Sequence, residues 1–76
     1  MRNFVEYIAK ALVEYPDDLR ISEVSGRREV IIELRCRNED MGRIIGKNGK
    51  TIGAIRMLVS GVAARHGRKA VLEIVE

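Results

Sequence analysis

A short turn bracketed by glycines is the part of this sequence whose residue types could do chemistry. Gly46 and Gly49 enclose Lys47 and Asn48, and Lys50 follows directly. Because glycine has no Cβ, a turn with glycine at both ends can pass close to another backbone. Lysine ammonium groups and the free amides that open a following helix both attract phosphate. The turn therefore indicates contact with a phosphate backbone, although a tight connection between two helices would use the same glycines.

The same turn matches part of the nucleotide-binding P-loop, because Gly49, Lys50 and Thr51 agree with the end of that motif. A P-loop also needs a glycine five positions before Gly49, and Ile44 occupies that position. A strand should lead into a P-loop, whereas a helix is expected here. The dinucleotide-binding motif fails as well, since Gly46 and Gly49 are spaced G-x-x-G. Nucleotide hydrolysis is therefore disfavoured.

The sequence contains no arrangement of residues that is typical of catalysis or of metal binding. Cys36 is the single cysteine and His66 the single histidine, so they cannot supply the four ligands of an ordinary zinc site. Asp17 and Asp18 follow a proline and are typical of a turn, while His66 lies where it would complement a helix dipole. We expect a protein that is not an enzyme and that has no metal or cofactor.

The distribution of charge favours a negatively charged partner. The formal net charge is +3, but residues 1–40 hold 7 basic and 9 acidic side chains, whereas residues 41–76 hold 7 basic and 2 acidic ones. The first part therefore carries −2 and the second +5. Such asymmetry is typical of a surface that meets phosphates or an acidic partner, although a solvated basic face would give the same pattern. The seven cations of the second part are Arg43, Lys47, Lys50, Arg56, Arg65, Arg68 and Lys69.

The length of 76 residues is enough for one hydrophobic core, so residues 1–76 are interpreted as a single domain. The 46% hydrophobic and 33% charged content is typical of a globular chain. A domain near this size buries only about 60% of the surface that its unfolded chain exposes, so self-association would help it. The apolar runs are too short for a transmembrane helix or a signal peptide, from which we expect a cytoplasmic protein without membrane contact.

The spacing of apolar residues predicts three helices and three strands around the turn. The helices are expected at residues 3–15, 39–45 and about 50–66. The strands are expected at residues 19–25, 28–37 and 70–75. Pro16 should end the first helix just after Tyr15, Asn38 is suited to cap the second, and Cys36 falls on the inward face of its strand. The order α-β-β-α-α-β predicts an α+β fold in which three helices pack on one face of a three-stranded sheet.

The segment from Ile45 to Ile52, with Gly46-Lys47-Asn48-Gly49 inside it, resembles the I-G-x-x-G-x-x-I signature of KH domains. The resemblance covers the whole chain, because the expected order of elements is that of the type II KH fold. The size is similar to that of small bacterial single-KH proteins of the KhpA kind. The resemblance implies binding of single-stranded RNA, about four nucleotides per domain, in RNA regulation or chaperoning.

The resemblance also implies which residues bind RNA. The loop glycines and the two residues between them would contact the RNA backbone, and isoleucines near the loop would line an apolar groove for bases. For Ile52 and Ile55, however, a place in the core explains the residue type and is favoured. The residues expected to bind RNA are Gly46, Lys47, Asn48, Gly49, Lys50, Arg43, Ile45, Ile52 and Arg56.

The aromatic residues lie away from this motif, since Phe4, Tyr7 and Tyr15 all fall in the first expected helix. Domains that read bases by stacking, such as the RRM and the cold-shock domain, need clustered aromatics on strands and are disfavoured. Base contact would then depend on aliphatic packing, which predicts weak binding and modest sequence preference. Single-stranded DNA stays open as a ligand, because a backbone clamp need not sense the 2′-hydroxyl.

The third expected helix has a core face, which carries Ile52, Ile55, Val59, Val62 and Ala63, and a second apolar face opposite to it. Small residues on the second face would allow a partner helix to approach closely. The resemblance implies a homodimer or pairing with a larger KH protein of the KhpB (Jag) kind. Alternatively, the long apolar side chains pack on the first helix; an adaptor with little RNA binding is the rival function. The expected partner interface comprises Ala54, Met57, Leu58, Gly61 and Arg65.

Overall fold

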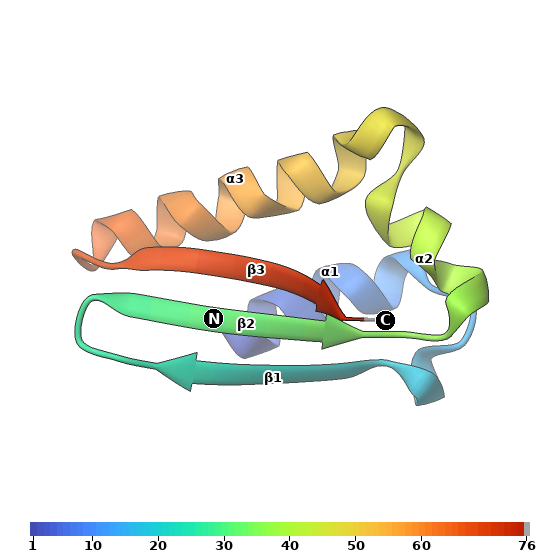
Figure 1. Ribbon diagram of the computed structural model, residues 1–76, viewed down its shortest axis with the longest axis horizontal. Helices are drawn as coiled ribbons and strands as arrows, with labels where there is room; N and C mark the ends of the chain where they lie inside the picture. Colours follow the sequence, from blue (N-terminus) through green and yellow to red (C-terminus); the bar gives the residue numbers. More distant parts are fainter. Residues whose placement is uncertain (76) are drawn as a thin grey trace.

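The computed structural model describes residues 1–75 and shows an α+β fold with the expected order of elements (Figure 1). The helices are α1 (Arg2–Leu12), α2 (Asn38–Ile45) and α3 (Lys50–Arg65). The strands are β1 (Arg20–Ser25), β2 (Glu29–Arg35) and β3 (Lys69–Val75). Two single turns of 3-10 helix, η1 (Pro16–Asp18) and η2 (Lys47–Gly49), precede β1 and α3. The predicted strands and the third helix agree with these bounds to within two residues.

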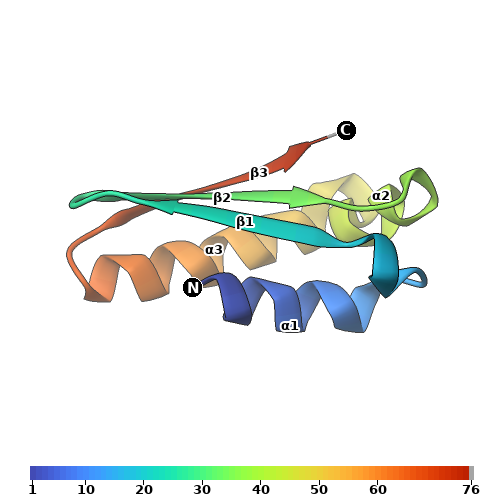
Figure 2. The same cartoon turned by 90° about the horizontal axis from the view of Figure 1, so that it is seen from below.

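The three strands form one mixed sheet in the order β1-β2-β3, with β2 in the centre. β1 runs antiparallel to β2, and their register places Glu23 opposite Ile32. β3 runs parallel to β2, and Leu72 lies opposite Ile32 on that side. A parallel pair needs a crossover connection, which α2, η2 and α3 supply. Seen along the sheet, α1 and α3 lie on the same side of it (Figure 2).

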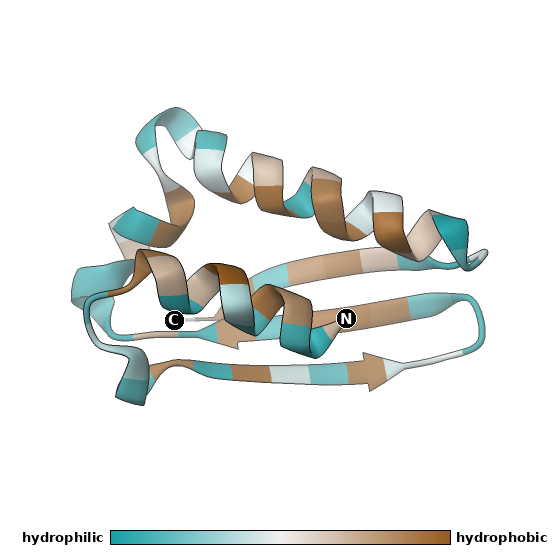
Figure 3. Cartoon of the chain, turned by 180° about the vertical axis from the view of Figure 1, so that it is seen from behind, coloured by the Kyte–Doolittle hydropathy of each residue, from teal (hydrophilic) through white to brown (hydrophobic). Residues whose placement is uncertain are grey.

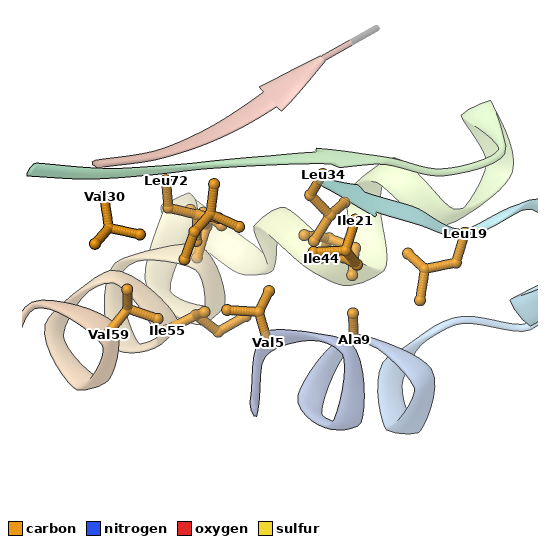
Figure 4. Close-up of a cluster of buried hydrophobic side chains, with 12 residues drawn as sticks. Val5, Ala9, Leu19, Ile21, Val30, Leu34, Ile44, Ile55, Val59 and Leu72 are labelled. Carbon is orange, nitrogen blue, oxygen red and sulfur yellow. The ribbon is translucent and has the colours of Figure 1, made fainter. Parts of the chain in front are cut away.

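The core fills the space between this sheet and the helices, as the expected alternation of β2 requires. Val30, Ile32 and Leu34 point inward and are almost completely buried. They meet apolar side chains of the helices, including Val5 of α1 and Val59 of α3 (Figure 4). The core thereby fixes α3, and with it the turn at the start of α3, relative to the sheet. The other buried apolar residues are Ala9, Leu19, Ile21, Ile44, Ile52, Ile55, Ala63 and Leu72.

The first helix is shorter than predicted, because α1 ends at Leu12 and not near Tyr15. Val13 is already extended, with φ −86° and ψ 152°. The amides of Glu14 and Tyr15 donate to the two carboxylate oxygens of Asp40 at 2.9 and 3.0 Å. Asp40 is completely buried at the start of α2. The Asp40 carboxylate therefore accepts hydrogen bonds from two amides that would have bonded to α1 carbonyls if the helix had continued.

Two predictions about single residues, one a helix cap and one a core position, were also wrong. Asn38 was expected to cap α2, but it is the first residue of that helix, and Arg37 occupies the capping position without a side-chain cap. Val62 was assigned to the core face of α3 and is instead 38% exposed. Cys36, expected on the inward face of the strand, follows the end of β2 and is half-buried against the core, and its Sγ donates to the Sδ of Met41 at 3.5 Å. Burial, followed by the charge of Asp40, raises the pKa of the Cys36 thiol and keeps it protonated.

Arg2 links α1 to the outer strand of the sheet. Its Nε donates to the carbonyl oxygen of Ile21 at 3.0 Å, and its amide donates to a carboxylate oxygen of Glu23 at 2.8 Å. The Ser25 hydroxyl, which donates to Glu23, lowers the pKa of that carboxyl first of all, and the Arg2 amide acts in the same direction. Glu23 therefore stays charged beside the start of α1.

Candidate nucleic-acid interface

The turn between α2 and α3 has a backbone that few residue types can adopt. Gly46 has a φ of 77°, Asn48 of 57° and Gly49 of 73°. Positive φ is accessible to glycine and, at lower cost than for most residues, to asparagine. The Gly49 amide donates to the Gly46 carbonyl at 3.2 Å and closes the turn. The residue types of the G-x-N-G motif are therefore those that this conformation requires.

The two glycines of the turn have different surroundings. A Cβ at Gly46 would lie 2.9 Å from the backbone nitrogen of Thr51 and closer still to the Thr51 side chain. A Cβ at Gly49 would meet nothing within 4 Å. Gly46 is therefore needed to let the turn fold against the start of α3. Gly49 instead leaves open space above the turn, where another backbone has room to approach.

The electrostatics of the turn favour an anion. Lys47 and Lys50 are exposed, and neither forms an ion pair within residues 1–75. Gly49 is the N-cap of α3 and offers no side chain to the first amides, and the first turn of α3 contains no acid. The positive end of a 16-residue helix is therefore uncompensated there. Such a helix start, flanked by two lysines, is a favourable place for a phosphate group.

Arg43, which the sequence predicts to bind RNA, is engaged by two carboxylates. Its Nη2 lies 3.3 Å from Oε2 of Glu14, and its Nε lies 3.3 Å from Oδ1 of Asp40. Together with the two amides that bind Asp40, these pairs hold α2 against the chain that follows α1. We call Arg43, Glu14 and Asp40 the brace. The two carboxylates of the brace offset the charge of Arg43.

A groove runs between α3 and the free edge of β3. Its volume is about 380 Å³. Arg56 contributes to its wall and donates from Nε and Nη2 to the carbonyl oxygen of Leu72 at 3.3 and 3.2 Å. In Figure 1, α3 runs alongside β3 and diverges from it toward the GXXG loop. The lining residues are Arg56, Val59 and Ser60 from α3 and Ala70, Val71, Leu72 and Glu73 from β3.

Of these lining residues, the sequence had singled out Arg56 alone for RNA binding. Val59 was assigned to the core, and the strand residues to a strand. No local pattern marks this groove, because its helix residues and its strand residues lie at least ten positions apart in the sequence.

The three isoleucines expected near the groove lie in two environments. Ile45 ends α2 beside the loop and is 36% exposed. Ile52 and Ile55 are buried in the core, as the favoured interpretation of the sequence had it. Of the three isoleucines, Ile45 alone therefore adds exposed apolar surface beside the loop.

The second apolar face of α3 is exposed along its length. Met57 is 75% exposed and Leu58 is 53% exposed, so neither is covered by α1. Ala54, Gly61 and Arg65 on the same face are exposed too. Figure 3 shows apolar residues recurring along α3. The alternative in which Met57 and Leu58 pack on the first helix is therefore wrong.

Residues 1–75 contain no group of three or more histidine, cysteine or acidic side chains placed to hold a metal ion. Among the same residues, no helix combines the length and apolar character needed to cross a bilayer. His66 is exposed at the C-terminal end of α3, where its amide donates to the Ala63 carbonyl.

A mixed three-stranded sheet, helices packed on it and a GXXG turn between two of those helices define the chain as a KH-domain protein. Comparison with protein families agrees with that class. The family model described as KhpA/KhpB, KH domain, matches residues 2–74, so the chain belongs to this family. A KH domain is a binding module, and the chain is accordingly not an enzyme.

Several bacterial relatives are similar to the chain over its whole length. An RNA-binding protein KhpA of Chlamydia pneumoniae is 47% identical over 76 residues, which cover 100% of this chain and 97% of the relative. Proteins of the same name from Clostridium acetobutylicum and Halalkalibacterium halodurans are 41% and 42% identical, over 99% and 100% of this chain and 100% of each relative. Among solved structures, none matches the chain significantly.

Proposed function

We propose that this chain binds single-stranded RNA through the loop Gly46-Lys47-Asn48-Gly49 and the adjoining groove between α3 and β3. The observation that carries the proposal is the turn itself. It combines open space above Gly49, two lysines that form no ion pair among residues 1–75, and a helix start without an acidic residue in its first turn. The names of the curated relatives, which are RNA-binding proteins, support the same conclusion.

In this mechanism the RNA backbone crosses the loop and its bases turn toward the groove. Phosphate oxygens accept from the amides at the start of α3, and Lys47 and Lys50 supply charge without fixing a base identity. Asn48 offers an amide group at the exposed tip of the turn. Ile45 and the aliphatic wall of the groove give the bases an apolar surface.

The groove has few means of recognising sequence. No aromatic side chain lines it, so bases gain no stacking platform there. Glu73 is an acceptor for base amino groups, and Arg56 already donates to the Leu72 carbonyl. The binding is therefore weak for one domain and tolerant of sequence. Such binding suits RNA regulation or chaperoning in the cytoplasm, where many different strands are engaged in turn.

The exposed apolar face of α3 supports association with a second KH domain, as a homodimer or with a larger protein of the KhpB (Jag) kind. Met57 and Leu58 provide most of the exposed apolar surface, and Ala54 and Gly61 allow a helix to approach. Arg65 closes the face at the end of α3. Two weak RNA sites in one assembly would bind a strand more tightly than either site alone.

The test is a titration of fluorescent single-stranded RNA and DNA pools at two salt concentrations. The wild-type protein should bind RNA, and its affinity should fall as the salt concentration rises, because phosphate contacts release counterions. Lys47→Asp with Asn48→Asp should abolish binding, since the loop loses one positive charge and gains two carboxylates that repel phosphate. The matched control is Lys10→Glu with Asn3→Asp, which adds the same charge on the exposed surface of α1. Equal binding by wild type and the loop variant, with helical circular dichroism intact, would refute the site.

The adaptor alternative has its own supporting observation, which is the exposure of Met57 and Leu58. Light scattering of the same samples separates the two functions. A protein that is dimeric but binds no RNA would use α3 as its working surface and leave the loop unused. Met57→Asp should then convert the dimer to a monomer.

A further inference from the structure

A second cluster of cations lies at the end of the molecule opposite the GXXG loop. Arg27 and Arg28 belong to the turn between β1 and β2, Arg68 belongs to the turn between α3 and β3, and Lys69 is the first residue of β3. We call these four residues the turn patch. Figures 1 and 2 both show these two turns together at one end and the loop between α2 and α3 at the other.

The fold brings the two turns together by specific contacts. A guanidinium nitrogen of Arg68 donates to the carbonyl of Gly26 at 2.7 Å, across 42 positions of sequence. The amide of Lys69 donates to the carbonyl of Arg28 at 2.7 Å and begins the pairing of β3 with β2. The turn patch is therefore a fixed feature of the sheet end.

The charges of the turn patch are largely uncompensated. Arg27, Arg28 and Lys69 are exposed, and in the described chain none of the four cations forms an ion pair. Two acidic residues lie on the same strands. Glu29 lies opposite Lys69 in the sheet, and Glu23 accepts a hydrogen bond from the Arg2 amide and pairs with the N-terminal ammonium. Arginine presents a planar set of donors that matches phosphate well. The surplus of cations thus favours a phosphate-bearing ligand.

The groove connects this end to the loop. Arg56 stands in its wall toward the loop, while Ser60 and Ala70 line it toward the turn patch. Ala70 directly follows Lys69 in β3. The 16 residues of α3 separate loop and patch by about 24 Å. A strand that leaves the loop along the groove therefore arrives at the turn patch.

We propose that the turn patch binds phosphates of the same RNA strand that the loop holds, and so extends the bound length beyond the four nucleotides of a single GXXG site. This inference rests on the proposed function of the loop. Arg27 and Arg28 are its distinctive members, because they come from the hairpin of the sheet and not from the helix pair that carries the GXXG turn.

The test compares oligouridines of four and of about twelve nucleotides. Per four-nucleotide register, wild type should bind the longer strand on the order of tenfold more tightly, with a steeper dependence on salt. Arg27→Ala with Arg28→Ala should remove most of that gain, lower the salt slope for the long strand by about 1.4, and leave the four-nucleotide affinity within about twofold. The side chains of both arginines make no hydrogen bond among residues 1–75, so the fold should persist.

The matched control is Lys10→Ala with Arg35→Ala, which removes two exposed cations elsewhere and should keep the gain with length. A length gain that persists in the Arg27/Arg28 variant would overturn the proposal and assign the gain to a second protomer, which the mass of the complex would reveal. Equal affinity of wild type for both lengths would also overturn it and favour an acidic protein as ligand. Failure of wild type to bind either strand would refute the loop function instead.

Discussion

The two ends of α3 offer a phosphate two different kinds of surface. At the first end, positive φ at Gly46, Asn48 and Gly49 fixes a turn with open space above it, and two lysines stand beside it. At the second end, four cations gather at two turns whose backbones need not approach a ligand closely. By our proposals, the loop recognises RNA through its shape and its charge together, whereas the turn patch depends on its charge alone.

This difference predicts how each end responds to substitution. A shaped site fails when one backbone conformation is lost, because the remaining contacts no longer fit. A charged surface weakens in steps, since each phosphate contact contributes nearly independently to the salt dependence. The brace holds α2, which leads into the loop, whereas the turn patch is held by a side-chain hydrogen bond from Arg68 and by the backbone pairing of β3 with β2.

The largest expected effect is on the brace. Asp40→Ala would leave the Glu14 and Tyr15 amides without their acceptor and should lower the free energy of unfolding by about 3 kcal/mol. Urea titration followed by circular dichroism measures it. Asp17→Ala, at an exposed position of η1, is the control and should change stability by less than about 0.5 kcal/mol. An equally small effect at Asp40 would show that the loop end needs no brace.

The next effect separates the glycines of the turn. Gly46→Ala should destabilise the fold by about 2 kcal/mol, because a positive φ is combined with a clash against the Thr51 backbone. The same urea titration gives the value. A loss well below 1 kcal/mol would mean that the turn adjusts easily and that its shape is not fixed.

Gly49→Ala should lower stability less, by about 1 kcal/mol, since only the backbone conformation is strained and the space is open. The same substitution should lower the affinity for RNA more than Gly46→Ala does relative to its effect on stability, because the new methyl group projects into the space assigned to the RNA backbone. Titration with the four-nucleotide strand should show a loss on the order of tenfold. Unchanged affinity would place the backbone elsewhere.

The smallest effect concerns base preference in the groove. Glu73→Gln keeps the size of the side chain but replaces a carboxylate acceptor by an amide that also donates. The ratio of affinities for oligocytidine and oligouridine should fall a fewfold, since cytosine offers an amino group and uracil does not. Competition titration with the two oligonucleotides measures the ratio, and an unchanged ratio would exclude Glu73 from base contact.

The sequence predicts the fold well because its main signals are local. Alternation in β2 and helical spacing in α3 depend on burial against one neighbour layer, and both elements appear as expected. The G-x-N-G turn is likewise encoded in residue types that its own backbone demands. The boundaries failed where distant groups decide them, as at Tyr15, whose amide binds Asp40.

The remaining features of the site depend on tertiary contacts that no spacing reveals. Arg43 resembles a free cation in sequence, yet Glu14 lies 29 positions away and pairs with it. Glu73 and Ala70 become groove residues only through the position of α3. The turn patch joins cations from two turns 42 residues apart, so its existence follows from the register of β2 and β3 and not from either turn.

The arginine contacts at the two outer strands have a consequence for solubility. By the alternation of each ladder, the carbonyls of Ile21 and Leu72 face away from β2, and Arg2 and Arg56 respectively donate to them. An unprotected outer strand invites pairing with another chain and growth into filaments. In this sheet, an arginine side chain donates to one outward-facing carbonyl on β1 and another does so on β3. These arginines therefore hinder edge-to-edge pairing of the sheet with another chain, which favours association of copies through the helical layer.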